Sequence, residues 1–554
     1  MFFSRKYTCK RPGVIFCGAC SLVSHCSSQW QHRRQWSSTY QTHLQQKLPK
    51  SFDFSWGNVP AYSLFDGSSV DAKLPKHLQL CFAASGDLRN IVETVCKLPH
   101  NCEEKVTIYI SDRNPNIAAR NFLLLELLKE YGYEAIDTVI GAWYSFFLTE
   151  QQSSLITRVA TAAVKRPSDN DLVDMDIFIP FTGAFSMAAP SDMLKSGSRS
   201  SSLITHFNPQ VWEMLSSICK VSSTSHSMLE VHDEEYLLGS NFAKRKLHRL
   251  RPPHSLGWME FHKWGILLPF GASRAGFKQP NPFLFEPGHG WILSEEDDPL
   301  NGWDPLEVLP AGLRHGLSSM DLYGCLFFHL KERLTLFVNR LHTCNIDLRI
   351  FCEDASQLAE RLKKSKICLH SVDTSNMTDS NYLGIKKVLL DWGPTLDRCS
   401  DYKTTLITFL MNWAYETPKA KEHTTLSKMT WRDIEAAISS IAKKGSGAKY
   451  ILGLFVEGNE VGDISVLNYF HDFDNMFSDY LDSKFTARAA ADVGLQRRGK
   501  HCVVPHRFFV SKNASATIYP GISATFEECY YHTVVSELNL TERFVEWEVT
   551  DQEK

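Results

Sequence analysis

Apolar and polar residues alternate most regularly in the first quarter of the chain. Residues 78–84 form a short apolar run that stops at Ser85-Gly86-Asp87, which is typical of a buried strand ending in a glycine turn. Apolar residues then recur at helical spacing over residues 88–98. This pattern predicts a strand followed directly by a helix.

The same pattern occurs a second time immediately downstream. Residues 106–110 are rich in β-branched side chains and predict a strand that ends near Asp112. Residues 117–131 predict a long helix with four apolar residues on one face: Ala118, Phe122, Leu125 and Leu128. Because strands that alternate with helices are the signature of a parallel sheet, we predict an α/β fold with a Rossmann-like core.

The two predicted strand ends carry residues suited to a nucleotide. Ligands of open α/β sheets bind beyond the carboxyl ends of the strands. Gly86 permits close approach of the backbone, Asp87 follows it, and Asp112 stands where a carboxylate accepts hydrogen bonds from a ribose. These three residues are the candidate cofactor site, for a dinucleotide or for S-adenosylmethionine.

A structural role for the same residues is the competing interpretation. The first turn has a single glycine and lacks the repeated glycines of a phosphate-binding loop. In this interpretation Asp87 caps the following helix, and Asp112 opens an Asp-Arg-Asn-Pro turn. Both interpretations stay open at this point.

Three ordered blocks resemble a known family: Trp-Gly-Asn-Val-Pro-Ala at 56–61, Phe-Ala-Ala-Ser-Gly-Asp-Leu-Arg-Asn at 82–90, and Asp-Arg-Asn-Pro at 112–115 followed by Ala-Arg-Asn at 119–121. The chain here resembles the domain of unknown function 4470, which is similar to a domain in an axonemal dynein assembly factor and in proteins with a MYND-type zinc finger. The resemblance implies a fold like that of class I methyltransferases.

Weaker likeness extends the resemblance over residues 50–415. Residues 281–285 and 373–384 resemble later blocks of the same domain. Residues 367–370 are expected to be a strand that returns to the sheet after an inserted subdomain, and residues 392–394 and 409–413 are expected to form a closing helical region.

Composition divides the chain into five predicted parts. They are a Cys/His segment (1–50), the first part of the Rossmann-like domain (51–165), an irregular insertion (166–310), the second part of the Rossmann-like domain (311–415), and a linker with a mixed C-terminal region (416–554).

Four cysteines in the first part are candidate metal ligands: Cys9, Cys17, Cys20 and Cys26. Their surroundings resemble the middle of a MYND-type finger, which holds two zinc ions with eight ligands. Lys6, Trp30, Thr39 and His43 stand at the other expected ligand positions. One zinc held by a rearranged set, a decayed finger without metal, and an error in the assigned start of the sequence all remain open, because a structural zinc needs four ligands.

Overall composition narrows the class of partner. A net charge of −3 gives no reason to expect nucleic acid or an anionic membrane, and we find no apolar run of about 18 residues that could span a bilayer. The acid-free stretch before Asp53 can mimic a mitochondrial transit peptide. The scattered cysteines favour free thiols in a reducing compartment, so we predict a cytoplasmic location.

These observations favour a non-catalytic protein that interacts with other proteins or assists their assembly. The alternative is an S-adenosylmethionine-dependent methyltransferase, in which Gly86 and Asp87 line the cofactor, Asp112 binds the ribose and residues 373–376 lie at the reaction end. A third candidate is a zinc-dependent binding module formed by residues 9–43.

Overall fold

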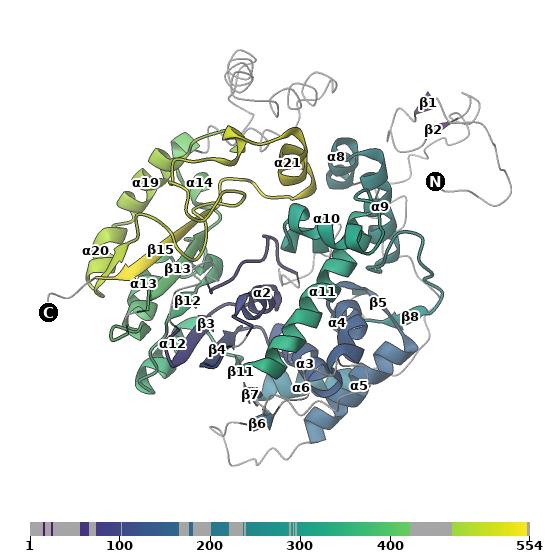
Figure 1. Cartoon of the computed structure of the whole chain (residues 1–554), viewed down its shortest axis with the longest axis horizontal. Coiled ribbons are helices and arrows are strands. Elements are labelled where there is room, and N and C mark those ends of the chain that lie inside the picture. The colour runs from purple at the N-terminus through teal and green to yellow at the C-terminus, as the bar shows by residue number, and fades with distance from the viewer. Residues whose placement is uncertain are drawn as a thin grey trace.

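The computed structural model describes most of the chain. The described ranges are 56–65, 74–100, 102–165, 201–220, 240–286, 296–400, 402–420 and 468–550, with short pieces at 15–16, 24–25, 177–180, 237, 290–291 and 293. Figure 1 shows the arrangement of helices and strands.

Within these residues the main sheet has nine strands. Their order across the sheet is β14 (Leu495–Arg497), β15 (Arg543–Val549), β13 (Thr405–Leu410), β12 (Ser371–Asp373), β3 (His77–Phe82), β4 (Lys105–Ser111), β11 (Asn345–Phe351), β7 (Ser202–His206) and β6 (Ile177–Pro180). The six strands from β13 to β7 are parallel, whereas β15 and β6 run antiparallel to their neighbours. The predicted α/β fold with a mostly parallel sheet is confirmed.

Alternate residues of the strands face two separate cores. In β3, Leu78, Leu80 and Phe82 belong to one core, while Cys81 belongs to the other. This alternation is expected from a pleated strand that is covered on both faces. The sheet is therefore the middle layer of three.

Helices cover both faces of the sheet (Figure 1). The first core contains residues of α2 (Arg89–Lys97), α3 (Pro115–Tyr131), α4 (Ile136–Tyr144), α5 (Glu150–Lys165), α6 (Pro209–Lys220), α8 (Asn241–Arg249), α9 (Pro252–Trp264), α10 (Pro305–Arg314), α11 (Leu322–Thr343) and α21 (Phe526–Tyr530). The second contains residues of α12 (Ala355–Lys364), α13 (Ile385–Trp392), α14 (Trp413–Glu416), α19 (Asp474–Ser483) and α20 (Thr486–Ala491). None of the helices searched among the described residues is long and apolar enough to cross a membrane.

The early predicted elements are confirmed. The predicted strands correspond to β3 and β4, which pair in parallel, and the predicted helices correspond to α2 and α3. Two later expectations are wrong, the second of them only in part. The returning strand starts at Ser371 rather than within 367–370, where Leu369 makes only an isolated bridge to Leu396. The expected closing helical region is found at 392–394 and begins again at Trp413, whereas residues 409–410 end strand β13. A fully buried strand and a buried helix give similar continuous apolar runs, so the sequence did not separate them.

The C-terminal strands join the same sheet because β15 pairs with β13, and a buried ion pair reinforces this edge. Arg498 Nη1 lies 2.8 Å from Glu546 Oε2 on β15, and its side chain also donates to Thr405 Oγ1 on β13. Glu546 is fully buried and also accepts the backbone N–H groups of Val503 and Val504. The segment from Arg498 to β15 is thus tied to β13, which comes much earlier in the chain.

We predict that Arg498→Met lowers the free energy of unfolding by about 3–5 kcal/mol, because it leaves the Glu546 carboxylate buried without its cation. Urea unfolding followed by circular dichroism measures this change. Lys364→Met, which removes an exposed partner of Glu360, is the matched control and should leave the urea midpoint unchanged. Equal midpoints for the two variants would contradict the prediction.

Candidate functional site

The turn after β3 brings two of the predicted site residues into contact. Gly86 has a left-handed backbone, with φ of 57°, and its N–H donates to Asp112 Oδ2 at 3.0 Å. This φ favours glycine, because a side chain is strained there. The contact follows from the parallel pairing of β3 with β4, which brings the ends of both strands to one edge of the sheet.

Both carboxylate oxygens of Asp112 accept backbone N–H groups, one from each of the turns that follow β3 and β4. Its Oδ1 accepts the N–H of Asn114 at 2.9 Å, while Oδ2 accepts the N–H of Gly86. Asn114 then caps α3 by accepting the N–H of Asn116 at 2.9 Å. Burial raises the pKa of the Asp112 carboxyl. The Asp-Arg-Asn-Pro turn expected from the sequence is confirmed.

Asp87 is bound by residues of another segment. It is 1% exposed; its Oδ2 accepts the N–H of Gly57 at 3.0 Å, and its Oδ1 forms an ion pair with Arg89 Nη1 at 2.7 Å. Leu88 stands at the N-cap position of α2 without a side-chain cap bond, but Asp87 Oδ1 accepts the N–H of Arg89, the first residue of the helix, at 3.2 Å. The expected role of Asp87 at the start of α2 is therefore found one residue before the N-cap position. The same carboxylate is also bound by the N–H of Gly57 and by the Arg89 guanidinium.

Residues 56–65, which we call the strap, cross the carboxyl edge of the sheet. Arg89 Nε donates to the carbonyl of Val59 at 3.1 Å, and the N–H of Ala61 donates to the carbonyl of Gly302 at 2.9 Å. A Cβ on Gly57 would lie 1.6 Å from Arg89 Nη1, so the close approach of strap and arginine requires glycine. Backbone and side-chain groups therefore hold the strap along its length.

The strap also binds the end of β12. Tyr62 donates its hydroxyl to Asp373 Oδ2 at 3.0 Å, and its N–H donates to Asn90 Oδ1 at 3.0 Å. Asp373 Oδ1 accepts the N–H of Ser375 at 2.8 Å. Burial raises the pKa of Asp373 to about 6, and it raises the pKa of the Tyr62 hydroxyl well above its usual value.

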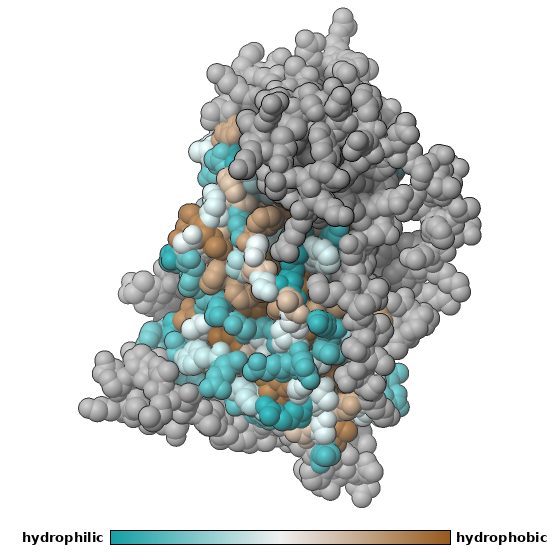
Figure 2. Space-filling model, turned by 90° about the vertical axis from the view of Figure 1, so that its right-hand side faces the viewer, coloured by the Kyte–Doolittle hydropathy of each residue, from teal (hydrophilic) through white to brown (hydrophobic). Residues whose placement is uncertain are grey.

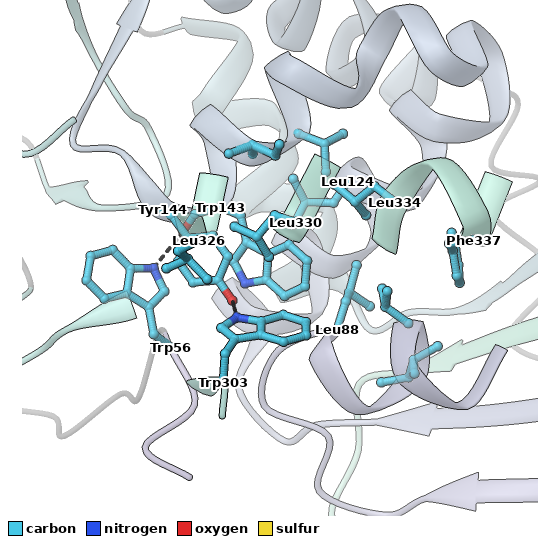
Figure 3. Packing of buried hydrophobic residues seen from close by; sticks show 14 of the residues in the cluster. Trp56, Leu88, Leu124, Trp143, Tyr144, Trp303, Leu326, Leu330, Leu334 and Phe337 are labelled. Carbon is cyan, nitrogen blue, oxygen red and sulfur yellow. Dashed lines mark hydrogen bonds between the residues drawn. The ribbon is translucent and has the colours of Figure 1, made fainter. Parts of the chain in front are cut away.

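Indole and phenol rings pack around the start of the strap (Figure 3). Trp56 Nε1 donates to the carbonyl of Trp143 at 2.6 Å, and Trp303 Nε1 donates to the Tyr144 hydroxyl at 3.0 Å. Trp143 and Tyr144 stack with ring centroids 4.9 Å apart. All four residues are buried, so this end of the strap belongs to the hydrophobic core.

A buried cation lies close to the acids of the turn. Arg120 on α3 is 2% exposed. Burial lowers the pKa of its guanidinium, and the negative charges of Asp87 and Asp112 act in the opposite direction. Together with Arg89, it balances negative charge beneath the strap. This arrangement lets three carboxylates stay within a low-dielectric region.

Sequence reasoning missed the strap contacts and the role of Asn281. The Asn281 side chain donates to the carbonyls of Ala142 at 2.9 Å and Ser145 at 2.7 Å, at the C-terminal end of α4. Residues 281–285 resemble a block of the family pattern, but a bond across 139 residues leaves no local signal. Asn281 therefore supports the helix end that carries Trp143 and Tyr144.

A shallow cleft lies elsewhere, between α9 and the start of α11. Its lining includes Glu260, Phe270, Arg274 and Tyr323, and Glu260 forms an ion pair with Arg274. On the side of the molecule that Figure 2 shows, hydrophilic side chains are interspersed with hydrophobic ones over the described residues. This cleft contains none of the predicted cofactor residues.

The predicted metal ligands Cys9, Cys17, Cys20 and Cys26 lie outside the described residues. Across the part of the chain that the structure describes, no three His, Cys, Asp or Glu residues form a group that could hold a metal ion.

Residues 55–148 match the family model described as Domain of unknown function (DUF4470). The match includes the strap, β3, β4 and the helices α2 to α4. The blocks at 281–285 and 373–384 lie outside it, so their resemblance stays a prediction. No curated protein and no solved structure matches the chain.

We predict that the stability difference between the wild type and Asp373→Asn depends on pH. The folded pKa of about 6 lies above the unfolded value of about 3.9, so the folded state retains a proton between these values. The stabilisation from this protonation is complete below about pH 4 and is lost as the pH rises through 6. Over that window the wild type should lose about 3 kcal/mol relative to the variant.

Urea unfolding at several pH values between 4 and 7 measures this difference. Burial also raises the pKa values of Asp304 and Asp379 to about 6. Both residues are present in the wild type and in the variant, so their contributions to the pH dependence cancel in the difference. A difference that stays constant across the window would contradict the assignment.

Proposed function

We propose that the chain is a non-catalytic cytoplasmic protein that binds other proteins or assists their assembly, on a fold like that of class I methyltransferases. The order β11-β4-β3-β12-β13-β15-β14, in which β15 runs opposite to the rest, supports the methyltransferase-like assignment because it is the order typical of that fold. Such a fold does not by itself imply catalysis. We propose neither nucleic acid nor a membrane as a partner.

The proposal rests on the hydrogen bonds that the chain already makes to the three carboxylates that follow the central strands. Asp87 is bound by Gly57 and Arg89, Asp112 by two backbone N–H groups, and Asp373 by Tyr62 and Ser375. A ligand that needed these oxygens would compete with buried hydrogen bonds at Asp87 and between Tyr62 and Asp373, and with partly buried ones at Asp112. Leaving a buried donor unpaired costs about 1–3 kcal/mol. The chain itself supplies the partners that a nucleotide would otherwise supply.

These residues do not fit S-adenosylmethionine well. Asp112 stands at the position for a ribose, but the amides of Gly86 and Asn114 already bind both of its oxygens. Asp87 binds the strap, and buried rings of Trp56 and Tyr144 fill the adjoining space. We therefore assign no methyl transfer to this site.

We predict that titration calorimetry of the full chain with S-adenosylmethionine detects no binding up to about 1 mM ligand, a concentration at which even a weak site of about −4 kcal/mol would be half filled. The Asp112→Ala variant provides the matched control, and it should behave like the wild type. Micromolar binding that disappears in Asp112→Ala would overturn the proposal and favour the methyltransferase.

A variant that loosens the strap distinguishes an enzyme whose cofactor site is covered by the strap from a fold that binds no cofactor. Tyr62→Phe removes the hydrogen bond to Asp373 and retains the ring that packs against Phe544. The proposal expects no binding of S-adenosylmethionine by this variant either. Binding that appears only in Tyr62→Phe would identify a methyltransferase closed by its own strap.

The N-terminal cysteines favour a second, compatible function, namely a zinc-dependent interaction module. The resemblance to a MYND-type finger and the spacing of Cys17 and Cys20 support it. Metal analysis of the purified chain tests this candidate: one zinc per chain that is lost in Cys17→Ser supports it, and a zinc content near zero removes it.

A further inference from the structure

Helix α8 carries five basic residues and no acid. Its sequence over Asn241–Arg249 is Asn-Phe-Ala-Lys-Arg-Lys-Leu-His-Arg. One side of the helix packs inward, because Ala243 and Leu247 belong to the first core. Figure 1 shows α8 at the edge of the molecule. The other side of the helix is therefore available to carry basic residues at the surface.

Two of the basic residues of α8 have partners within the chain. Lys246 is 7% exposed, and its Nζ lies 2.7 Å from Glu537 Oε1 and donates to the carbonyl of Val535 at 2.9 Å. Arg249 Nη2 donates to the carbonyl of Thr533 at 2.9 Å. These contacts hold α8 against the C-terminal segment and determine which side of the helix faces outward.

The outward side of the helix consists of Lys244, Arg245 and His248, which are all exposed and which we call the α8 face. Residues three or four apart are neighbours on a helix, so the three side chains share one side. Among the described residues, no carboxylate forms an ion pair with Lys244 or Arg245. Arg245 and Arg249 are also four residues apart, and like charges at this spacing destabilise a helix. A negatively charged partner would relieve this repulsion.

Exposed cations on other helices have an acid within reach. Lys364 on α12 pairs with Glu360 at 2.7 Å, and Lys387 on α13 pairs with Asp391 at 2.5 Å. In both pairs the two residues are four positions apart on the same helix, which is a favourable spacing for opposite charges. The α8 face has no acid at any such position, because its helix contains none.

We propose that the α8 face is a docking site for an acidic peptide segment of another protein. Charge complementarity supports this partner, because its carboxylates supply the counter-charges that α8 lacks. The helix is about 14 Å long, so about four or five extended residues of a peptide would cover it. Phe526, which is 40% exposed and lies against Arg251 just after α8, offers an apolar contact at the end of the helix.

The surroundings of the α8 face favour a peptide over a nucleic acid. Glu527 pairs with Arg251 at the end of α8 and its side chain is 55% exposed, so a longer polyanion would meet this negative charge. The whole chain has a net charge of −3, whereas a nucleic-acid-binding protein usually carries an extended basic patch. This inference rests on the proposed function, since it names the chemistry of a protein partner.

Fluorescence anisotropy of a labelled decaglutamate peptide, titrated with the full chain, tests the docking site. The wild type is expected to bind at about 50 mM salt and to lose at least about tenfold in affinity at about 500 mM, because salt screens exposed charges. The double charge reversal Lys244→Glu, Arg245→Glu should weaken binding at the lower salt concentration by at least about tenfold.

The double reversal Lys386→Glu, Lys387→Glu on α13 is the control, since it changes the net charge by the same amount at another exposed site. This variant is expected to bind the peptide as tightly as the wild type. The proposal is overturned if the wild type does not bind at the lower salt concentration, or if both double variants lose affinity equally.

A single-stranded DNA of the same charge as the peptide provides the second comparison. The α8 face is expected to bind the peptide at least as tightly as the DNA, and tighter binding of the DNA would overturn the proposal in favour of a nucleic acid partner. Failure of the peptide titration would leave the proposed function standing, because the calorimetric titration with S-adenosylmethionine tests that function separately.

Discussion

A parallel sheet gathers the ends of its strands at one edge, and the acids at this edge must find partners once they are buried. Here the strap supplies several of them. It gives the N–H of Gly57 to Asp87 and the hydroxyl of Tyr62 to Asp373, and it accepts a bond from Arg89. Because a buried polar group without a partner costs several kcal/mol, the carboxyl edge and the strap depend on each other.

The three carboxylates at this edge are stabilised by three different kinds of partner. Asp87 has a cation, since Arg89 forms an ion pair with it. Asp112 has one backbone N–H from its own turn and one from Gly86 in the turn after β3. Asp373 has a phenol hydroxyl and one amide, and its pKa rises to about 6 because no ion pair offsets its burial. The differences follow from which segment reaches each strand end, rather than from the strands themselves.

Local patterns were enough to predict β3, α2, β4 and α3, because the apolar spacing of each element is complete within a short stretch. The contact between Gly86 and Asp112 also followed, since parallel neighbours end at one edge. The bond between Asp87 and Gly57 did not follow, because nothing near Asp87 in the sequence indicates that a second segment reaches it beside the start of α2. The bond between Tyr62 and Asp373 spans 311 residues and leaves no periodic signal. Strand β12 has only three residues, too few to establish an alternation.

The central claim is that the strap is part of the folded core, and amide hydrogen exchange tests it most directly. The N–H groups of Gly57 and Tyr62 donate to the buried side chains of Asp87 and Asn90. We expect these two amides to exchange as slowly as those in the middle of α2, because both open only when the core opens. Exchange of the Gly57 and Tyr62 amides at the rate of an unprotected chain, while α2 stays protected, would contradict it.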